Sequence, residues 1–169
     1  MKHFIFCISL LSCITEPVLA QGVFLTATKQ SAYDTALDDL TIAITNHDYT
    51  LIKIQPVDLG LRKKGYESAD YKVLFFGNSE QVRKVLTSNP EASVLLPLKI
   101  ILYRKGNTVV ASAPSLKMWK DVFGKTLNGM INSWETDTQE ILRAFEKQQE
   151  RKNHGIIAGN SSRSLPAIK

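Results

Sequence analysis

A hairpin pattern in the second half of the chain most constrains its fold. Two β-rich runs, Leu98–Tyr103 and Thr108–Ser112, are joined by the short segment Arg104–Asn107, which contains a glycine. A connection this short joins antiparallel neighbours, because a parallel pair needs a crossover of about a dozen residues or more. The sequence therefore predicts a sheet with at least one antiparallel pair.

Three further segments, 23–28, 49–55 and 71–76, have the composition of strands. The second alternates in part, and Ile52 and Ile54 are predicted to share one of its faces. The third is an almost unbroken apolar run, which is typical of a strand buried on both faces or nearly so.

Helix signals lie between these strands. Over residues 33–44 apolar side chains recur every three or four positions, with Ser31 as the predicted N-cap. Asn46–Asp48 is expected to close this helix, since asparagine tolerates the left-handed conformation of helix ends. Residues 57–64 have the pattern of a shorter helix, with Asp58 near its start.

A third helix is predicted to follow the apolar run. Asn78, after Gly77, is the predicted N-cap, and Gln81 is placed to complete a capping box. The pair Asn89-Pro90 ends this helix, because the residue before a proline avoids the helical conformation.

The C-terminal part is predicted to be helical and then irregular, with Pro114 and Ser115 opening a separate helical stretch ahead of the last helix. Asn132 is expected to start a last helix, whose range is 131–152, and 153–169 is expected to be a flexible tail with little to bury. Together the elements predict an α+β fold, with a single mostly antiparallel sheet and helices packed on it. The domain itself is placed over residues 21–130.

The first twenty residues have the pattern of a secretory signal peptide. Lys2 precedes an apolar run, Pro17 breaks it, and small residues before Gln21 predict cleavage after Ala20. The run is too short to span a membrane, so we expect a periplasmic or secreted protein without a transmembrane anchor. The alternative is an N-terminal core element of a cytosolic protein, which no helical or strand period supports.

Both cysteines lie in this predicted leader. Removal of residues 1–20 would eliminate Cys7 and Cys13, leaving a mature chain with neither thiol nor disulfide. Lipid anchoring is the alternative, because Leu10–Cys13 resembles a bacterial lipobox in which Cys13 is modified. The whole chain is 44% hydrophobic and 22% charged, which argues against a disordered or collagen-like protein.

Several motifs in the middle of the chain recur in a known order. They are the segment 71–78, the pair Asn89-Pro90, the segment 95–100, the hairpin and Pro114. With these motifs, residues 24–120 resemble the bacterial and archaeal family called domain of unknown function 302. The structural motif comprises five residues: Gly77, Asn78, Asn89, Pro90 and Pro97.

This resemblance implies a compact β-α-β-β-β-β-α fold and a capacity to form a homodimer. It implies no reaction, because the family has no established activity. Many members carry Pro-Cys-Asn where this chain has Pro97-Leu98-Lys99, so no thiol role carries over. The helix-start asparagine is often followed by proline, and here Ser79 takes that place.

Residues able to bind metal or catalyse are sparse after the leader. His47 and His154 are far apart, without the spacing of a zinc site, so we expect no metal and no cofactor. His47 is expected at a helix end, with haem ligation as the alternative. The turn Gly77–Glu80 superficially resembles a nucleophile elbow, but helix capping explains its residues.

Acidic and basic groups are expected on solvated surface. Asp34 and Asp38 lie one helical turn apart with Asp39 beside them, and further acids fall within 135–140; catalysis would need them in a pocket. The net charge is +5, in small basic groups such as Arg62–Lys64 that are interspersed with acids. We therefore expect no nucleic-acid partner, with nonspecific attraction to anionic lipid or cell-wall polymer as an alternative.

Two main functional hypotheses remain, and a third alternative is a structural interaction role through the last helix and the tail. The first is a noncatalytic exported module that binds a small ligand or a protein partner, as a homodimer. The second is a periplasmic hydrolase whose carboxylates or hydroxyls are brought together only by the fold. The first predicts an apolar or mixed cleft, whereas the second predicts two acids, or an acid and His47, facing each other in a cavity.

Overall fold

The computed structural model describes residues 22–160, with side chains described as far as residue 148. Its strands and helices, in chain order, are β1 (Phe24–Lys29), α1 (Tyr33–Thr45), β2 (Thr50–Pro56), α2 (Val57–Lys63), β3 (Tyr71–Gly77), α3 (Ser79–Ser88), β4 (Leu98–Lys105), β5 (Thr108–Pro114) and α4 (Lys120–Asn160). Two 3-10 helices, η1 (Pro90–Leu95) and η2 (Lys117–Trp119), precede β4 and α4.

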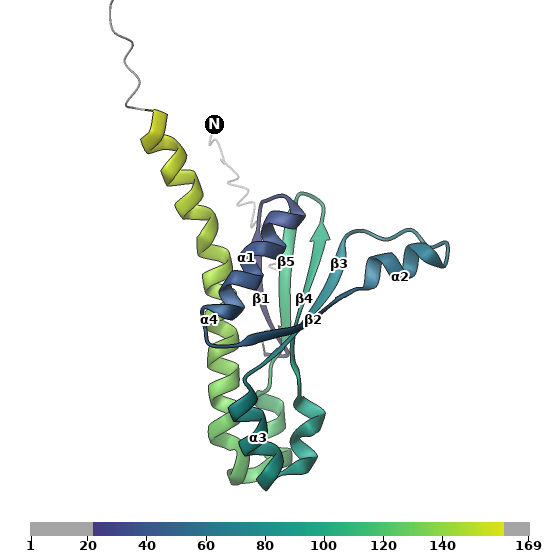
Figure 1. Ribbon diagram of the computed structural model, residues 1–169, viewed down its shortest axis with the longest axis vertical. Coiled ribbons are helices and arrows are strands. Elements are labelled where there is room, and N and C mark those ends of the chain that lie inside the picture. The colour runs from purple at the N-terminus through teal and green to yellow at the C-terminus, as the bar shows by residue number, and fades with distance from the viewer. Residues whose placement is uncertain (1–21, 161–169) are drawn as a thin grey trace, which may run out of the picture.

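The strands form one five-stranded sheet in the order β1-β5-β4-β3-β2, and every neighbouring pair is antiparallel (Figure 1). The predicted hairpin is confirmed as β4–β5, where Gly106 takes a φ of 58° at the turn. With helices packed on this sheet, the α+β fold class is confirmed.

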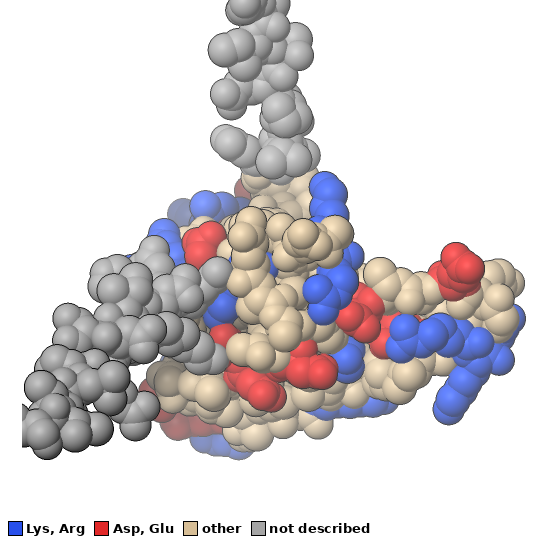
Figure 2. Space-filling model, turned by 90° about the horizontal axis from the view of Figure 1, so that it is seen from above, with Lys and Arg blue, Asp and Glu red and all other residues tan. Residues whose placement is uncertain are grey.

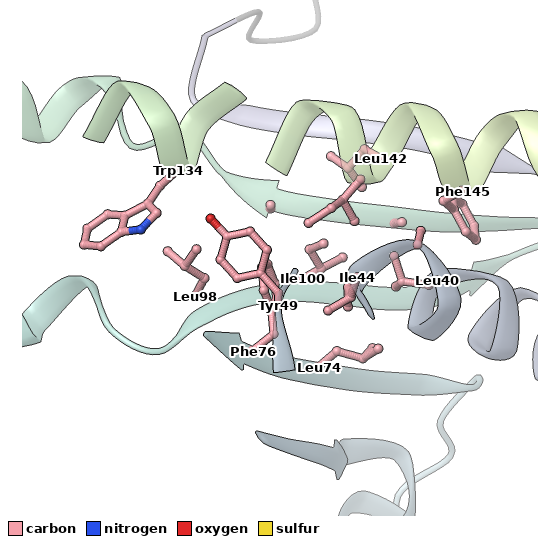
Figure 3. Packing of buried hydrophobic residues seen from close by; sticks show 14 of the residues in the cluster. Leu40, Ile44, Tyr49, Leu74, Phe76, Leu98, Ile100, Trp134, Leu142 and Phe145 are labelled. Carbon is pink, nitrogen blue, oxygen red and sulfur yellow. The ribbon is translucent and has the colours of Figure 1, made fainter. Parts of the chain in front are cut away.

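Helices α1 and α4 lie side by side on one face of the sheet (Figure 1). Between them and the strands lies a single hydrophobic core, which Figure 3 shows from close by. Three α4 side chains, Ile131, Trp134 and Phe145, belong to this core, so the C-terminal helix is an integral part of the domain. The strands contribute alternate residues to it: Ala27, Leu74, Phe76, Leu98, Ile100, Leu102, Val109, Ala111 and Ala113.

Helix α2 stands away from the rest of the molecule at the ends of β2 and β3 (Figure 1). Its range confirms the predicted short helix, and Gly65, with a φ of 83°, lies just beyond its end. Asp58 is buried in its first turn and is paired with Arg62 one turn later.

The face predicted for the side chains of β2 is wrong because the strand contains a β-bulge. Its pairing with β3 shifts between Leu51 and Lys53. The bulge inserts one extra residue, so Leu51 and Ile54 both pack against the core although they are three positions apart. Ile52 is therefore 60% exposed rather than buried beside Ile54.

Both predicted caps of α1 are also corrected. The N-cap is Ala32, and the Ser31 hydroxyl donates to the Ala32 carbonyl instead of accepting from the helix. At the other end, Asn46 is right-handed and Asp48 takes the left-handed conformation, with a φ of 61°. The helix does end at the predicted segment, with Asn46 as its C-cap, but the left-handed residue is Asp48, since aspartate tolerates that conformation nearly as asparagine does.

Helix α4 is longer than predicted. It begins at Lys120 rather than Asn132, is interrupted at Gly124, and extends to Asn160, beyond the expected end at residue 152. Asn132 lies inside the helix with its side chain exposed to water, so it caps no helix end. Among residues 22–160 no helix is long and apolar enough to cross a membrane. The predicted leader and positions 161–169 of the predicted tail lie outside the described residues.

Candidate binding surfaces

One face of the sheet is covered by no described helix. Its central part, here called the open face, consists of the alternate residues that point away from α1 and α4: Tyr71, Val73 and Phe75 of β3, Ile101 and Tyr103 of β4, and Val110 of β5. None of these belongs to the core between sheet and helices. Val110 is only 5% exposed because its neighbours within the sheet shield it, and the other five are half-buried.

The two ends of the open face differ in charge. At one end Phe75 lies between Lys53 of β2 and Lys99 of β4, which are its partners in the sheet register. At the other end Asp70 precedes β3 and accepts a hydrogen bond of 3.0 Å from Arg104 Nε.

The end that carries the Asp70–Arg104 ion pair continues into a hollow under α2. This pocket of about 290 Å3 is lined by Tyr71 and Tyr103 of the open face, by Asp70, and by Val57 and Leu61 of α2. The rings of Tyr71 and Tyr103 are 6.3 Å apart, a cross-strand aromatic pair. The apolar side of α2 therefore forms a wall that extends the open face.

Basic side chains elsewhere are dispersed. Viewed from above, Figure 2 shows lysines and arginines in small groups with acidic residues between them, and both signs on the projecting α2 segment. That segment carries Arg62, Lys63 and Lys64 together with Glu67, all exposed.

A second candidate surface is a groove between α3 and the first half of α4. It has a volume of about 450 Å3. Buried Val85 and Leu127 form its base. Lys84 carries the only ionisable side chain among the described residues that line it, which are Gln81, Lys84, Val85, Ser88, Asn89, Thr126, Leu127, Gly129, Met130 and Ser133.

The predicted motif residues shape the α3 side of this groove. Asn78 is confirmed as the N-cap of α3: its Oδ1 accepts from the backbone N–H groups of Glu80 and Gln81, each at 3.1 Å. Gly77 ends β3, where a Cβ would lie 3.4 Å from a side-chain carbon of the bulged strand. Asn89 ends α3 and lines the groove.

The other two motif residues lie farther along the chain. Pro90 begins η1, and Pro97 precedes β4 after a cis peptide bond. The motif is therefore a set of turns around α3, and of its five residues only Asn89 touches the groove.

One end of the groove is closed by hydrogen bonds among three elements. Trp134 Nε1 of α4 donates to Gln81 Oε1 of α3 at 2.8 Å, and the Tyr49 hydroxyl donates to Asp137 Oδ2 at 2.7 Å. Figure 3 shows the Tyr49 hydroxyl pointing toward α4 beside the Trp134 ring. The predicted capping box is therefore wrong for Gln81, because its side-chain oxygen accepts from Trp134 and Tyr49 and links α3 to α4 instead.

Burial raises the pKa of the Tyr49 phenol well above its ordinary value, and the hydrogen bond to Asp137 adds to the rise. Tyr49 therefore stays protonated and donates its hydrogen bond at every physiological pH. The phenol is a fixed link between the turn before β2 and α4 rather than an acid–base group.

Two acidic residues predicted on solvated faces are buried instead. Glu135 is 3% exposed and accepts hydrogen bonds from the Ser115 hydroxyl and the Leu116 backbone N–H, which fastens α4 to the end of β5. Asp39 is 3% exposed and forms an ion pair with Lys29 of β1. These two carboxylates can be buried because each forms a hydrogen bond or an ion pair with a donor from another part of the fold.

The remaining predicted acids and His47 do not meet. Asp34 and Asp38 are exposed on α1, as expected. His47 Nδ1 lies 2.7 Å from the Ala43 carbonyl at the end of that helix, away from both candidate surfaces. Within residues 22–148 no three His, Cys, Asp or Glu side chains gather as metal ligands would. His154 falls where side chains are not described.

Sequence reasoning missed Lys29, Tyr49 and Gln81 as tertiary partners. For Lys29 the sequence does contain an indication. Residues two apart in a strand point to the same face, so Lys29 points to the core with Leu25 and Ala27. For Tyr49 and Gln81 no local pattern could reveal that their partners lie on α4.

Comparisons with known proteins agree with this fold. A family model described as Domain of unknown function DUF302 matches residues 25–145. The structure is similar to the crystal structure of an uncharacterized conserved DUF302 protein from Bacillus stearothermophilus, with 17% identity and a TM-score of 0.62 over 75% of this chain and 97% of that one. At such identity the likeness shows the fold alone. No curated protein matches the sequence.

Proposed function

Because this chain belongs to the DUF302 family, whose name specifies no activity, we propose its function from its surfaces. It is a noncatalytic exported binding module, and it acts as a homodimer that forms through the open face. The observation that carries this proposal is the apolar composition of an uncovered sheet face.

An antiparallel sheet that faces water normally places polar residues on that side. Here Tyr71, Val73, Phe75, Ile101 and Tyr103 occupy it instead, so β3 and β4 are apolar on both faces. Apolar patches larger than a few hundred square ångströms on soluble proteins mark interaction sites. A partner that covers this face would remove the cost of exposing it.

A second copy of the chain would cover more than the open face itself. The open face covers only about 250 Å2 in projection at ordinary strand spacing and rise, and the whole sheet of five strands covers roughly 500 Å2. A stable interface of about 800 Å2 per partner would therefore include the polar strands beside the open face and the wall formed by α2.

The charges at the two ends support a two-fold arrangement. An axis that lies between the two sheets and runs across the strands would place Lys53 and Lys99 of one copy over the Asp70–Arg104 ion pair of the other. The side chain of Asp70 is 37% exposed, so its carboxylate remains accessible beside Arg104. Such self-complementarity is what a two-fold interface requires.

The dimer is tested by light scattering coupled to size-exclusion chromatography. We expect the mass of two chains for the wild type and of one chain for Val73→Lys, because two like charges would meet in the interface. The matched control is Ile42→Lys, at an exposed apolar position on α1, which should leave the dimer intact.

Circular dichroism checks that each variant is folded before its mass is compared with that of the wild type. If Val73→Lys misfolds, Tyr103→Glu replaces it at a second position on the same face. A folded wild type that stays monomeric at micromolar concentration, or a folded Val73→Lys variant that stays dimeric, contradicts the proposal.

Export is proposed from the sequence of residues 1–20. We propose that the leader is removed after Ala20 and that the protein acts in the periplasm or outside the cell. The intact mass of protein recovered from its own host tests this, since cleavage after Ala20 and lipidation at Cys13 give different masses. Recovery of the uncleaved chain from the cytosol would contradict export.

A further inference from the structure

We propose that the groove between α3 and α4 is a binding site for a small amphipathic carboxylate, with its apolar body against the base and its anionic head at Lys84. The site lies on a different surface from the open face. The inference therefore stands whether or not the chain dimerises.

The groove has the size and chemistry of a small-molecule site. Its volume of about 450 Å3 falls within the 300–1,000 Å3 of typical ligand pockets. Val85 and Leu127 supply a buried apolar base, to which Met130 adds a flexible side chain. Three further hydroxyl and amide side chains surround this base and can orient a polar head: Ser88, Asn89 and Thr126.

Gly129 leaves open space on the α4 side of the groove. It lies inside α4 with no positive φ, and a Cβ built on it would meet nothing within 4 Å. Neither backbone conformation nor close packing therefore requires glycine there, although glycine weakens a helix interior. Its effect is to leave unfilled space along the groove wall.

The ends of the groove are held by contacts that do not depend on a ligand. The Trp134–Gln81 hydrogen bond joins α3 to α4 at one end, and the Asn78 cap fixes the start of α3. The cleft is thus formed before binding, which lowers the entropy lost when a ligand enters.

The positive charge of Lys84 favours an anionic ligand. Lys84 is exposed at the edge and is the only ionisable side chain among the described lining residues, and the Asp137 carboxylate at the closed end already accepts hydrogen bonds from Tyr49 and Ser133. A carboxylate can accept a charge-assisted hydrogen bond from a lysine ammonium group. A cationic amphipath of equal size would meet repulsion at the same place.

Isothermal titration calorimetry with octanoate tests the site. We expect saturable binding of one octanoate per chain to the wild type. Gly129→Leu fills the groove wall and should abolish binding. The control is Gly60→Leu, which places the same side chain on α2, where a Cβ also meets nothing, and it should bind octanoate as the wild type does.

A second pair of measurements tests whether the positive charge of Lys84 contributes to octanoate binding. Lys84→Gln should weaken octanoate binding by about tenfold, the loss of one charge-assisted hydrogen bond, and should leave octylammonium binding unchanged or stronger. Arg83→Gln removes an adjacent exposed charge that does not line the groove and serves as the control.

Three results would overturn the inference. They are octanoate binding to Gly129→Leu that equals the wild type, equal affinity of the wild type for octanoate and octylammonium, and no octanoate binding to the wild type. The open face is excluded as the site if the folded monomeric variant Val73→Lys still binds octanoate. If that variant loses binding while Gly129→Leu keeps it, the groove assignment fails.

Discussion

Asn78 shows how a single side chain can join two separate segments. Its Oδ1 caps α3, while its Nδ2 donates to the Asp48 carbonyl at 3.1 Å in the turn after α1. The residue therefore fixes the direction in which the chain leaves β3, and with it the position of the groove wall.

Asn78→Ala should lower the free energy of unfolding by about 1 kcal/mol, because it removes both the cap and the tie to Asp48. Asn78→Asp keeps the capping oxygen and should lose less. Urea unfolding monitored by circular dichroism measures the difference. An unchanged transition midpoint in the alanine variant would remove this role from Asn78.

Tyr49 should make the stability of the fold depend on pH at the alkaline end. Its pKa is raised in the folded protein above the value of 10.0 expected for the unfolded chain. The stabilisation is therefore fully present below pH 10.0 and is lost as the pH rises above it, where the unfolded state releases the phenol proton first.

Thermal melts from about pH 8 to about pH 11 measure this effect. The wild-type melting temperature should fall at the alkaline end, and Tyr49→Phe should fall less steeply. Some slope should remain in the variant, because burial also raises the pKa of Tyr33. Parallel curves for both proteins would show that Tyr49 is not the group responsible.

At the scale of elements, the ion pair between Lys29 and Asp39 connects three of them. Lys29 of β1 pairs with Asp39 of α1, and its ammonium also donates to the Phe145 carbonyl of α4 at 3.2 Å. The ammonium lies 5.1 Å from the centre of the Phe145 ring. This contact sets how both helices lie against the edge of the sheet.

Lys29→Met should destabilise the protein by about 3–5 kcal/mol, because the buried Asp39 carboxylate loses its cationic partner. The double variant Lys29→Met with Asp39→Leu should recover much of that loss, since two apolar side chains can replace a buried pair. Urea unfolding of both single variants and of the double variant gives the coupling free energy between the two side chains. Losses that simply add would contradict a direct ionic interaction between the two side chains.

At the scale of the whole molecule, α4 is the element that holds the domain together. Its buried residues extend from Leu127 to Phe145, and Glu135 fastens it to the end of β5. Beyond Phe145 no described side chain of this helix belongs to the core.

Deletion of residues 153–169 should therefore leave the melting temperature and the solubility unchanged, although the helical dichroism signal should fall because α4 reaches Asn160. A longer deletion from Ala144 removes the buried Phe145 and should destabilise the fold strongly. A lower melting temperature in the short deletion would show that the C-terminal end contributes to folding.

The sequence alone predicted the sheet, the hairpin and the helix cap at Asn78, because these depend on period, turn length and a local hydrogen bond. The almost unbroken apolar run 71–76 predicted a strand buried on both faces or nearly so. The described helices cover only one face, and Tyr71, Val73 and Phe75 on the other face remain half-buried.

Tertiary structure decided the rest. The bulge that turns Ile52 outward, the burial of Asp39 and Glu135, and the groove between α3 and α4 all depend on partners distant in the chain. Local patterns report which face of an element is apolar. They do not report which donor will meet a buried carboxylate, because that is fixed only when the elements pack.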